Sequence, residues 1–292
     1  MNRLVIIGML IFSVFILFCQ KNDESQKETG IRLIVRGDDI GSSHAANVGC
    51  IKSYQEGIMR SVEVMVPCPW FLEAAAMLHE NPGLDVGVHL TLTSEWENYK
   101  WGPITCAPSL VDSNGNFFPK QKDWVNENAT DAFWNARPDM QEVEQELRNQ
   151  IEMAMAHIPQ VSHLSGHMGI SSIDPKMAEL TSLLAEEYGL QINLDDYDVR
   201  GLRGMGSNKL PREEREQILI DSLETLKPGN YLLVEHPGID TPEMRHIGHD
   251  GYYHVSSDRD GVTKIFTSPR VKDVIERKNI ELISYADLKR LE

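Results

Sequence analysis

The stretch Leu33-Ile34-Val35-Arg36-Gly37-Asp38-Asp39-Ile40-Gly41 begins the first regular pattern in the chain. A short apolar run rich in β-branched residues stops at two adjacent carboxylates and a glycine, which predicts a buried strand with acids at its carboxyl end. Neighbouring carboxylates repel each other, and a bound hard cation is the usual remedy. A solvated turn with helix-capping acids is the alternative. The stretch alone leaves both interpretations open.

Strand and helix patterns alternate after this point. Further strands are expected at 61–66, 84–90, 160–167, 191–194, 231–238 and 280–283, and helices at 43–57, 70–79, 140–157, 175–188, 212–226, 271–278 and 285–291. Repeated strand–helix units indicate a parallel sheet. About seven such units in one domain of this length predict an α/β fold of the TIM-like β/α barrel type.

A long irregular insertion at 93–138 interrupts the alternation and holds four of the five tryptophans. Long irregular segments in compact domains are usually functional. Trp96 and Trp101 are our candidates for substrate binding, because aromatic rings offer flat apolar faces on which sugars stack. The alternative is that these rings only pack the insertion onto the barrel.

Titratable side chains stand at the carboxyl ends of several predicted strands. Asp38 and Asp39 end the first strand, and His89, His167 and His236 end three later ones. A lone histidine at such a place is more often a structural residue, but three of them with an acid pair are hard to explain by chance. In a β/α barrel these ends share one face, which holds the active site.

This set of side chains suits metal-assisted hydrolysis of an amide or ester. One carboxylate and two imidazoles form a common facial ligand set for a divalent metal, and Asp39, His89 and His167 supply it. Asp38 is then available as the general base, and His236 as the acid that protonates the leaving group.

The first 19 residues have the pattern of an export signal. A basic start precedes an apolar run from 4 to 18, which is shorter than the about 20 residues of a membrane span. Cys19 follows the run and is the expected lipid-attachment site, with an uncleaved anchor as the alternative. Residues 20–30 are expected to be a flexible tether, and 31–292 a single domain. This organisation predicts a membrane-tethered lipoprotein in the periplasm or at the cell surface.

Charge and cysteine content narrow the possible partners. The formal net charge is −16 and there is no basic cluster, which argues against nucleic acid or anionic lipid as a partner. A membrane association is therefore expected only through the N-terminal lipid or anchor. Cys50, Cys68 and Cys106 have no zinc-type spacing, and free thiols are the default, although a Cys68–Cys106 disulfide stays open.

A set of motifs occurs in a characteristic order. They are Gly37-Asp38-Asp39-Ile40-Gly41, residues 80–90, residues 108–112, His163-Leu164-Ser165-Gly166-His167, His236-Pro237-Gly238, residues 267–269 and residues 283–288. Taken together, this set resembles the YdjC-like carbohydrate deacetylases, the group that includes chitooligosaccharide deacetylases. The resemblance covers essentially all of 31–292.

The resemblance implies a TIM-like barrel with fewer than eight full units and removal of acetyl groups from N-acetylated sugars or oligosaccharides. It implies one divalent metal, magnesium or zinc, on Asp39, His89 and His167. It also implies Asp38 as catalytic base, and places His236 near the centre of the site. Hydrolysis of an O-acetyl ester or a phosphoester on the same metal, or non-catalytic glycan binding at the surface, are the alternatives.

The chain departs from the family pattern at two places. Arg36-Gly37 replaces the usual Asn-Ala, and an inward-pointing guanidinium would lower the pKa values of the neighbouring acids. Ser165-Gly166 replaces Asp-Ser, which removes an acid that could orient a ligand histidine. His163 is the expected replacement for that orienting group.

Overall fold

The computed structural model describes residues 30–291. The predicted export signal with Cys19, and the tether apart from Gly30, lie outside the described residues and stay predictions. The strands are β1 Ile31–Ile40, β2 Ser61–Val64, β3 Asp85–Leu90, β4 Val161–Gly166, β5 Val199–Gly201, β6 Gly229–Glu235 and β7 Glu281–Ile283. They form one parallel sheet in the order β4-β3-β2-β1-β6-β5, with β7 paired to β1.

The sheet curves as a half-barrel, which agrees with the predicted α/β, barrel-like fold, but a full closed barrel is not formed by the described residues. No pairing joins the edge strands β4 and β5 within residues 30–291. The predicted strand at 191–194 does not form. Residues 191–193 have no regular structure, and the 3-10 turn η3 Leu194–Tyr197 follows them, capped by Asn193, whose side chain accepts the backbone N–H of Asp195. Short polar side chains that bond the local backbone favour turns over strands, so the gap is left unclosed.

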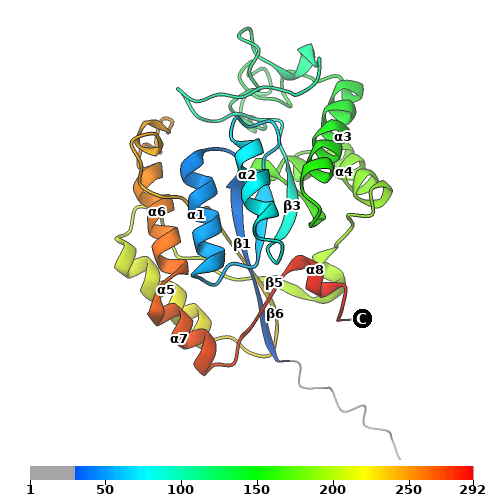
Figure 1. The fold of residues 1–292 in the computed structure, drawn as a ribbon. Helices are drawn as coiled ribbons and strands as arrows, with labels where there is room; N and C mark the ends of the chain where they lie inside the picture. Colours follow the sequence, from blue (N-terminus) through cyan, green and yellow to red (C-terminus); the bar gives the residue numbers. More distant parts are fainter. Residues whose placement is uncertain (1–29, 292) are drawn as a thin grey trace, which may run out of the picture.

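The helices, apart from the short last one, cover the outer face of the sheet (Figure 1). They are α1 His44–Gln55, α2 Phe71–His79, α3 Met140–His157, α4 Pro175–Glu187, α5 Arg212–Glu224, α6 Val255–Phe266, α7 Pro269–Arg277 and α8 Tyr285–Leu288. The predicted helix at 140–157 is confirmed to the residue as α3. α6 was not predicted, although Val255, Val262 and Phe266 are buried along it at helical spacing.

β1 is the centre of the sheet because it pairs with β2, β6 and β7. Leu33 and Val35 face the helices and belong to the main apolar core, whereas Ile34 packs with Ile283 and Tyr285 in a smaller cluster on the other face. Burial on both faces is typical of parallel strands. The acids at the end of β1 therefore stand on a strand that is buried on both faces and paired with neighbouring strands along its edges.

The insertion at 93–138 extends over the end of the sheet toward which β1 runs (Figure 1). Apart from the 3-10 turn η1 Pro108–Leu110 it has no helix or strand. Glu146 of α3 helps to hold this segment by accepting the backbone N–H groups of Ile104 and Thr105. The insertion thus adds side chains above the carboxyl ends of the strands.

Two other features concern the cysteines and the membrane. Cys50, Cys68 and Cys106 are all unpaired, so the default of free thiols is confirmed. Among the helices of residues 30–291, none combines the length and the hydropathy that a bilayer span requires.

Gly49 in α1 gives a stability prediction. A Cβ there would lie 2.5 Å from the backbone nitrogen of Gly238, in the His236-Pro237-Gly238 segment. Gly49→Ala should therefore lower the free energy of unfolding by about 1–3 kcal/mol despite the better helix propensity of alanine. Gly261 in α6 is the matched control, because its Cβ would meet nothing closer than 3.5 Å. Gly261→Ala should be neutral or stabilise by up to about 1 kcal/mol. Urea unfolding of both variants checks this, and equal effects would contradict it.

Candidate functional site

Asp39, His89 and His167 converge at the carboxyl end of the sheet. One ligand atom from each lies within 4.8 Å of the others, and all three side chains are buried. Asp39 Oδ1 is 3.6 Å from His89 Nε2 and 3.4 Å from His167 Nδ1. We call these three residues the triad. The structure thus brings together the three residues that the sequence analysis named as ligands.

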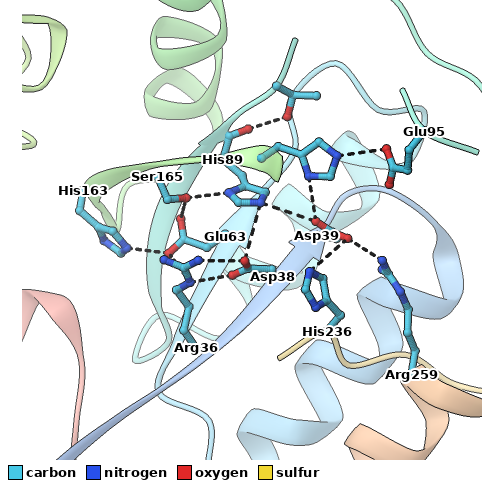
Figure 2. Close-up of polar contacts among 12 residues, drawn as sticks. Arg36, Asp38, Asp39, Glu63, His89, Glu95, His163, Ser165, His236 and Arg259 are labelled. Atoms are coloured by element: carbon cyan, nitrogen blue, oxygen red, sulfur yellow. Dashed lines mark hydrogen bonds and ion pairs between the residues drawn. The ribbon is translucent and has the colours of Figure 1, made fainter. Parts of the chain in front are cut away.

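The Asp39 carboxylate faces two different surroundings. The residue has a φ of 72°, in the left-handed region that non-glycine residues rarely adopt. Its Oδ2 accepts a hydrogen bond from Arg259 Nη2 at 2.7 Å, whereas its buried Oδ1 has no hydrogen-bond partner and faces the two imidazoles at ion-pair distance (Figure 2). A buried carboxylate oxygen that accepts no hydrogen bond is costly. An oxygen between two imidazole nitrogens suits a divalent cation, so these residues fit a metal.

The protonation of two triad members suits metal binding. Burial favours the neutral form of Asp39, but Arg259 and His236 outweigh burial and hold the pKa of this carboxyl well below its ordinary value. Burial also disfavours the charged form of His89 and lowers its pKa to about 4, with His167 acting in the same direction. At neutral pH the site therefore offers an ionised carboxylate and a neutral imidazole.

His167 is held by an acid that the sequence analysis missed. The Nε2 of His167 lies 3.1 Å from Oε2 of Glu95, a residue of the insertion (Figure 2). Burial opposes the charged imidazole, but Glu95 and Asp39 outweigh it and raise the pKa of His167 to about 10. Glu95 lies only six residues after a strand-end histidine. That spacing is the one feature of the sequence that could have indicated a role for Glu95 at the site, and it is a weak indication.

Arg36 points inward and clamps Asp38. Its Nε and Nη2 donate to the two Asp38 oxygens at 2.7 and 2.9 Å, and its Nη1 donates to the Tyr285 hydroxyl at 3.1 Å. Burial opposes the guanidinium charge, but Asp38 and Glu63 outweigh it and raise the pKa of Arg36. Asp38 Oδ2 lies 3.8 Å from His89 Nε2, so this carboxylate borders the triad.

A cavity of about 650 Å³ opens above the triad. Its lining includes Asp38, Asp39, His89, Glu95, Trp96, His167, His236, His249, Tyr252 and Arg259. His236 reaches it from the segment after β6, with Nε2 3.9 Å from Asp39 Oδ2 and a side chain 44% exposed. Polar groups converging in such a cavity are typical of a binding site.

The two candidate tryptophans differ in position. Trp96 lines the cavity but is only 4% exposed, because His249 stacks on its ring at 5.5 Å. Trp101 is buried beside His167, and its N–H donates to the backbone oxygen of Thr93. The structure therefore places Trp96 at the site and Trp101 behind it, and sugar contact by either stays a prediction.

His163 lies one layer below the triad. Its Nε2 is 2.7 Å from Glu63 Oε1, and its ring stacks on Tyr285 at 3.9 Å. Ser165, which replaces the family's acid, is the residue that contacts a triad histidine, with Oγ 2.7 Å from His89 Nδ1. Ser165 in turn donates to Glu63, so an acid that the sequence analysis missed stands behind it.

The pKa of His167 predicts how metal binding depends on pH. A metal needs the neutral imidazole, so below a pKa of about 10 binding must displace one proton from the metal-free protein. The association constant should then rise by about tenfold per pH unit between pH 6 and 9. Titration with Co²⁺, followed by absorbance, measures this slope, and a wild-type slope of zero would contradict the prediction.

Glu95→Gln should flatten that dependence, since it removes the acid that contributes most to raising the pKa of His167. Glu97→Gln is the matched control from the same segment. Its carboxylate accepts from Asp250 N and the Tyr253 hydroxyl instead. This control should retain the wild-type slope.

Comparisons with known proteins agree with the fold and the motifs. A family model described as YdjC-like protein matches residues 32–277. Carbohydrate deacetylase 1 of Listeria innocua is 30% identical over 269 residues, covering 88% of this chain and 100% of the relative. A carbohydrate deacetylase of Thermus thermophilus is 34% identical over 235 residues, covering 73% and 80%. A solved protein of Enterococcus faecalis V583, named for cellobiose-phosphate cleavage, has a TM-score of 0.70 at 24% identity over 89% of this chain and 99% of that one. The chain therefore belongs to the YdjC-like family.

Proposed function

We propose that this protein is a metal-dependent deacetylase that removes acetyl groups from N-acetylated amino sugars or oligosaccharides. The observation that carries the proposal is the convergence of Asp39, His89 and His167 beside Asp38 in one cavity. The names of the relatives, carbohydrate deacetylases of similar length, support a sugar substrate. The same geometry supports an amide hydrolysis in which one side chain takes a proton and another returns it.

A bound divalent ion would acidify water and polarise the acetyl carbonyl. Asp38 is the residue that takes the proton from the attacking water. The two hydrogen bonds from Arg36 hold its carboxylate in one orientation, and each oxygen keeps a further lone pair as an acceptor. Arg36 is therefore a clamp that aims the base toward the triad.

His236 is the residue that supplies a proton to the departing nitrogen. It stands on the segment after β6, apart from Asp38 on β1, and its Nε2 faces Asp39 at 3.9 Å. Its exposed side chain can exchange protons with solvent between turnovers. Amide hydrolysis uses a general base to take a proton from water and a general acid to protonate the leaving nitrogen, and Asp38 and His236 are the residues for these two roles.

The aromatic part of the cavity wall would hold the sugar. The rings of Trp96 and His249 are stacked, and the Tyr252 ring centroid lies 5.9 and 5.8 Å from theirs. These rings present apolar edges beside polar groups, as sugar-binding surfaces do. Glu235 and Arg215 line the same cavity and could bond sugar hydroxyls.

Acetate release from N-acetylated oligosaccharides tests the proposal. Asp38→Asn should lower kcat by about 10²–10⁴-fold, the usual contribution of a general base, while the bound metal content stays at the wild-type level. His236→Gln should also lower kcat. Exposed His246, ten residues further along the chain, provides the matched control, and His246→Gln should leave kcat unchanged.

The substrate panel should include O-acetylated sugars and phosphoesters, because a fold does not determine its substrate. Preferred release of acetate from amides supports the proposal. Turnover of esters or phosphoesters alone would replace it with the alternative hydrolases. Sugar binding without turnover in a metal-loaded protein would replace it with a glycan-binding function.

A further inference from the structure

Glu63 on β2 is a fully buried acid below the triad. Its Oε1 lies 2.7 Å from His163 Nε2, and its Oε2 accepts the hydroxyl of Ser165 (Figure 2). Both oxygens are therefore paired by neighbouring side chains. Glu63 does not line the cavity above the triad, so it has no access to a substrate there.

Strand register explains how Glu63 reaches these partners. Glu63 stands opposite Gly87 of β3, and Gly87 stands opposite His163 of β4. A Cβ on Gly87 would collide with the Glu63 carboxylate and lie 2.5 Å from His163 Nε2. The glycine thus opens a passage across β3, and Glu63 meets the side chains of β4 through it.

The protons in this network can be counted. Ser165 has one hydroxyl proton, and an ionised carboxylate can only accept, so that proton points to Glu63. Ser165 Oγ must then accept the hydrogen bond from His89 Nδ1, 2.7 Å away. A neutral His89 with its proton on Nδ1 has its lone pair on Nε2. This is the nitrogen that lies 3.6 Å from Asp39 Oδ1, on the side of the triad.

We propose that Glu63 is a positioning residue that acts through Ser165 to hold His89 in the Nδ1–H tautomer, with Nε2 presented to the metal. This inference rests on the proposed function in one respect, which is that His89 is a metal ligand. The acid that the motif of β4 lacks is thus supplied from β2, one hydrogen bond further from the histidine. Hydrogen bonds of this kind set the tautomer and orientation of metal-binding histidines.

The first test reads the tautomer directly. Long-range ¹H–¹⁵N spectra of the imidazoles, recorded on the full-length metal-free protein, distinguish a proton on Nδ1 from one on Nε2. His89, assigned with a His89→Gln variant, should show the Nδ1–H pattern in the wild type. It should become a mixture of tautomers in Ser165→Ala. An Nε2–H pattern in the wild type would overturn the proposal.

The second test measures Zn²⁺ affinity by calorimetry. Glu63→Gln and Ser165→Ala should each weaken Zn²⁺ binding by about 10–100-fold. The Zn²⁺ affinity of the double variant should equal that of the single variant with the lower affinity, since both substitutions break the same series of hydrogen bonds. Ser53→Ala is the matched control, because Ser53 is a buried serine of α1 whose hydroxyl has no hydrogen-bond partner in the described part of the chain. Equal weakening by Ser53→Ala would show a general loss of structure and overturn the proposal.

A rescue variant separates positioning from folding. Ser165→Asp in the Glu63→Gln background places a carboxylate directly at His89, and should restore both the tautomer and most of the Zn²⁺ affinity. Failure of this rescue in a variant with wild-type circular dichroism would count against the proposal. If the wild type binds no Zn²⁺, the proposed function fails, whereas the tautomer measurement still decides the role of Glu63.

Discussion

The hydrogen bond between Arg259 and Asp39 is the interaction on which the site depends. Two adjacent carboxylates at the tip of β1 are buried, with Asp38 4% and Asp39 2% exposed, and burying such a pair without compensation is costly. Each acid has its own guanidinium: Arg36 binds Asp38 with two hydrogen bonds, and Arg259 binds one oxygen of Asp39. The two clamps leave Asp39 Oδ1 facing the imidazoles. Asp39 is therefore kept ionised in the folded protein, and its Oδ1 stays available to a cation.

The inner side of the half-barrel is polar near the site, whereas barrel interiors are usually filled by branched apolar side chains. A connected series of hydrogen bonds runs from Asp85 through Ser162 and His163 to Glu63, and from there through Ser165 to His89. Fully satisfied buried networks hold their members in one arrangement. The apolar cluster around Ile34 lies further from the site on the same inner side. The side chains on this side of the sheet therefore change along the strands from apolar ones to hydrogen-bonded polar ones near the site.

The order of the elements and the strand-end positions of the acids and histidines were accessible from the sequence, since hydrophobic periodicity marks where a strand stops. The helix α6, which carries Arg259, shows the same periodicity, so its position was also accessible from the sequence. Glu63 is a different case. It stands within an alternating strand pattern, and nothing in its own neighbourhood indicates that it faces inward over a glycine of β3. The strand predicted at 191–194 does not form because Asn193 caps a turn there, and the barrel-like sheet stays open between β4 and β5.

The sequence by itself determined the parallel α/β class and the chemical types available at the strand ends, because both follow from local spacing along the chain. Only the tertiary structure decided which arginine clamps which acid, which acid holds which histidine, and that the sheet stays open between β4 and β5. Arg259 and Asp39 are 220 positions apart, and Ser165 and Glu63 are 102 apart. Such pairs form only where strand register and the packing of helices on the sheet bring the side chains within hydrogen-bonding distance, and local sequence patterns carry no information about that distance.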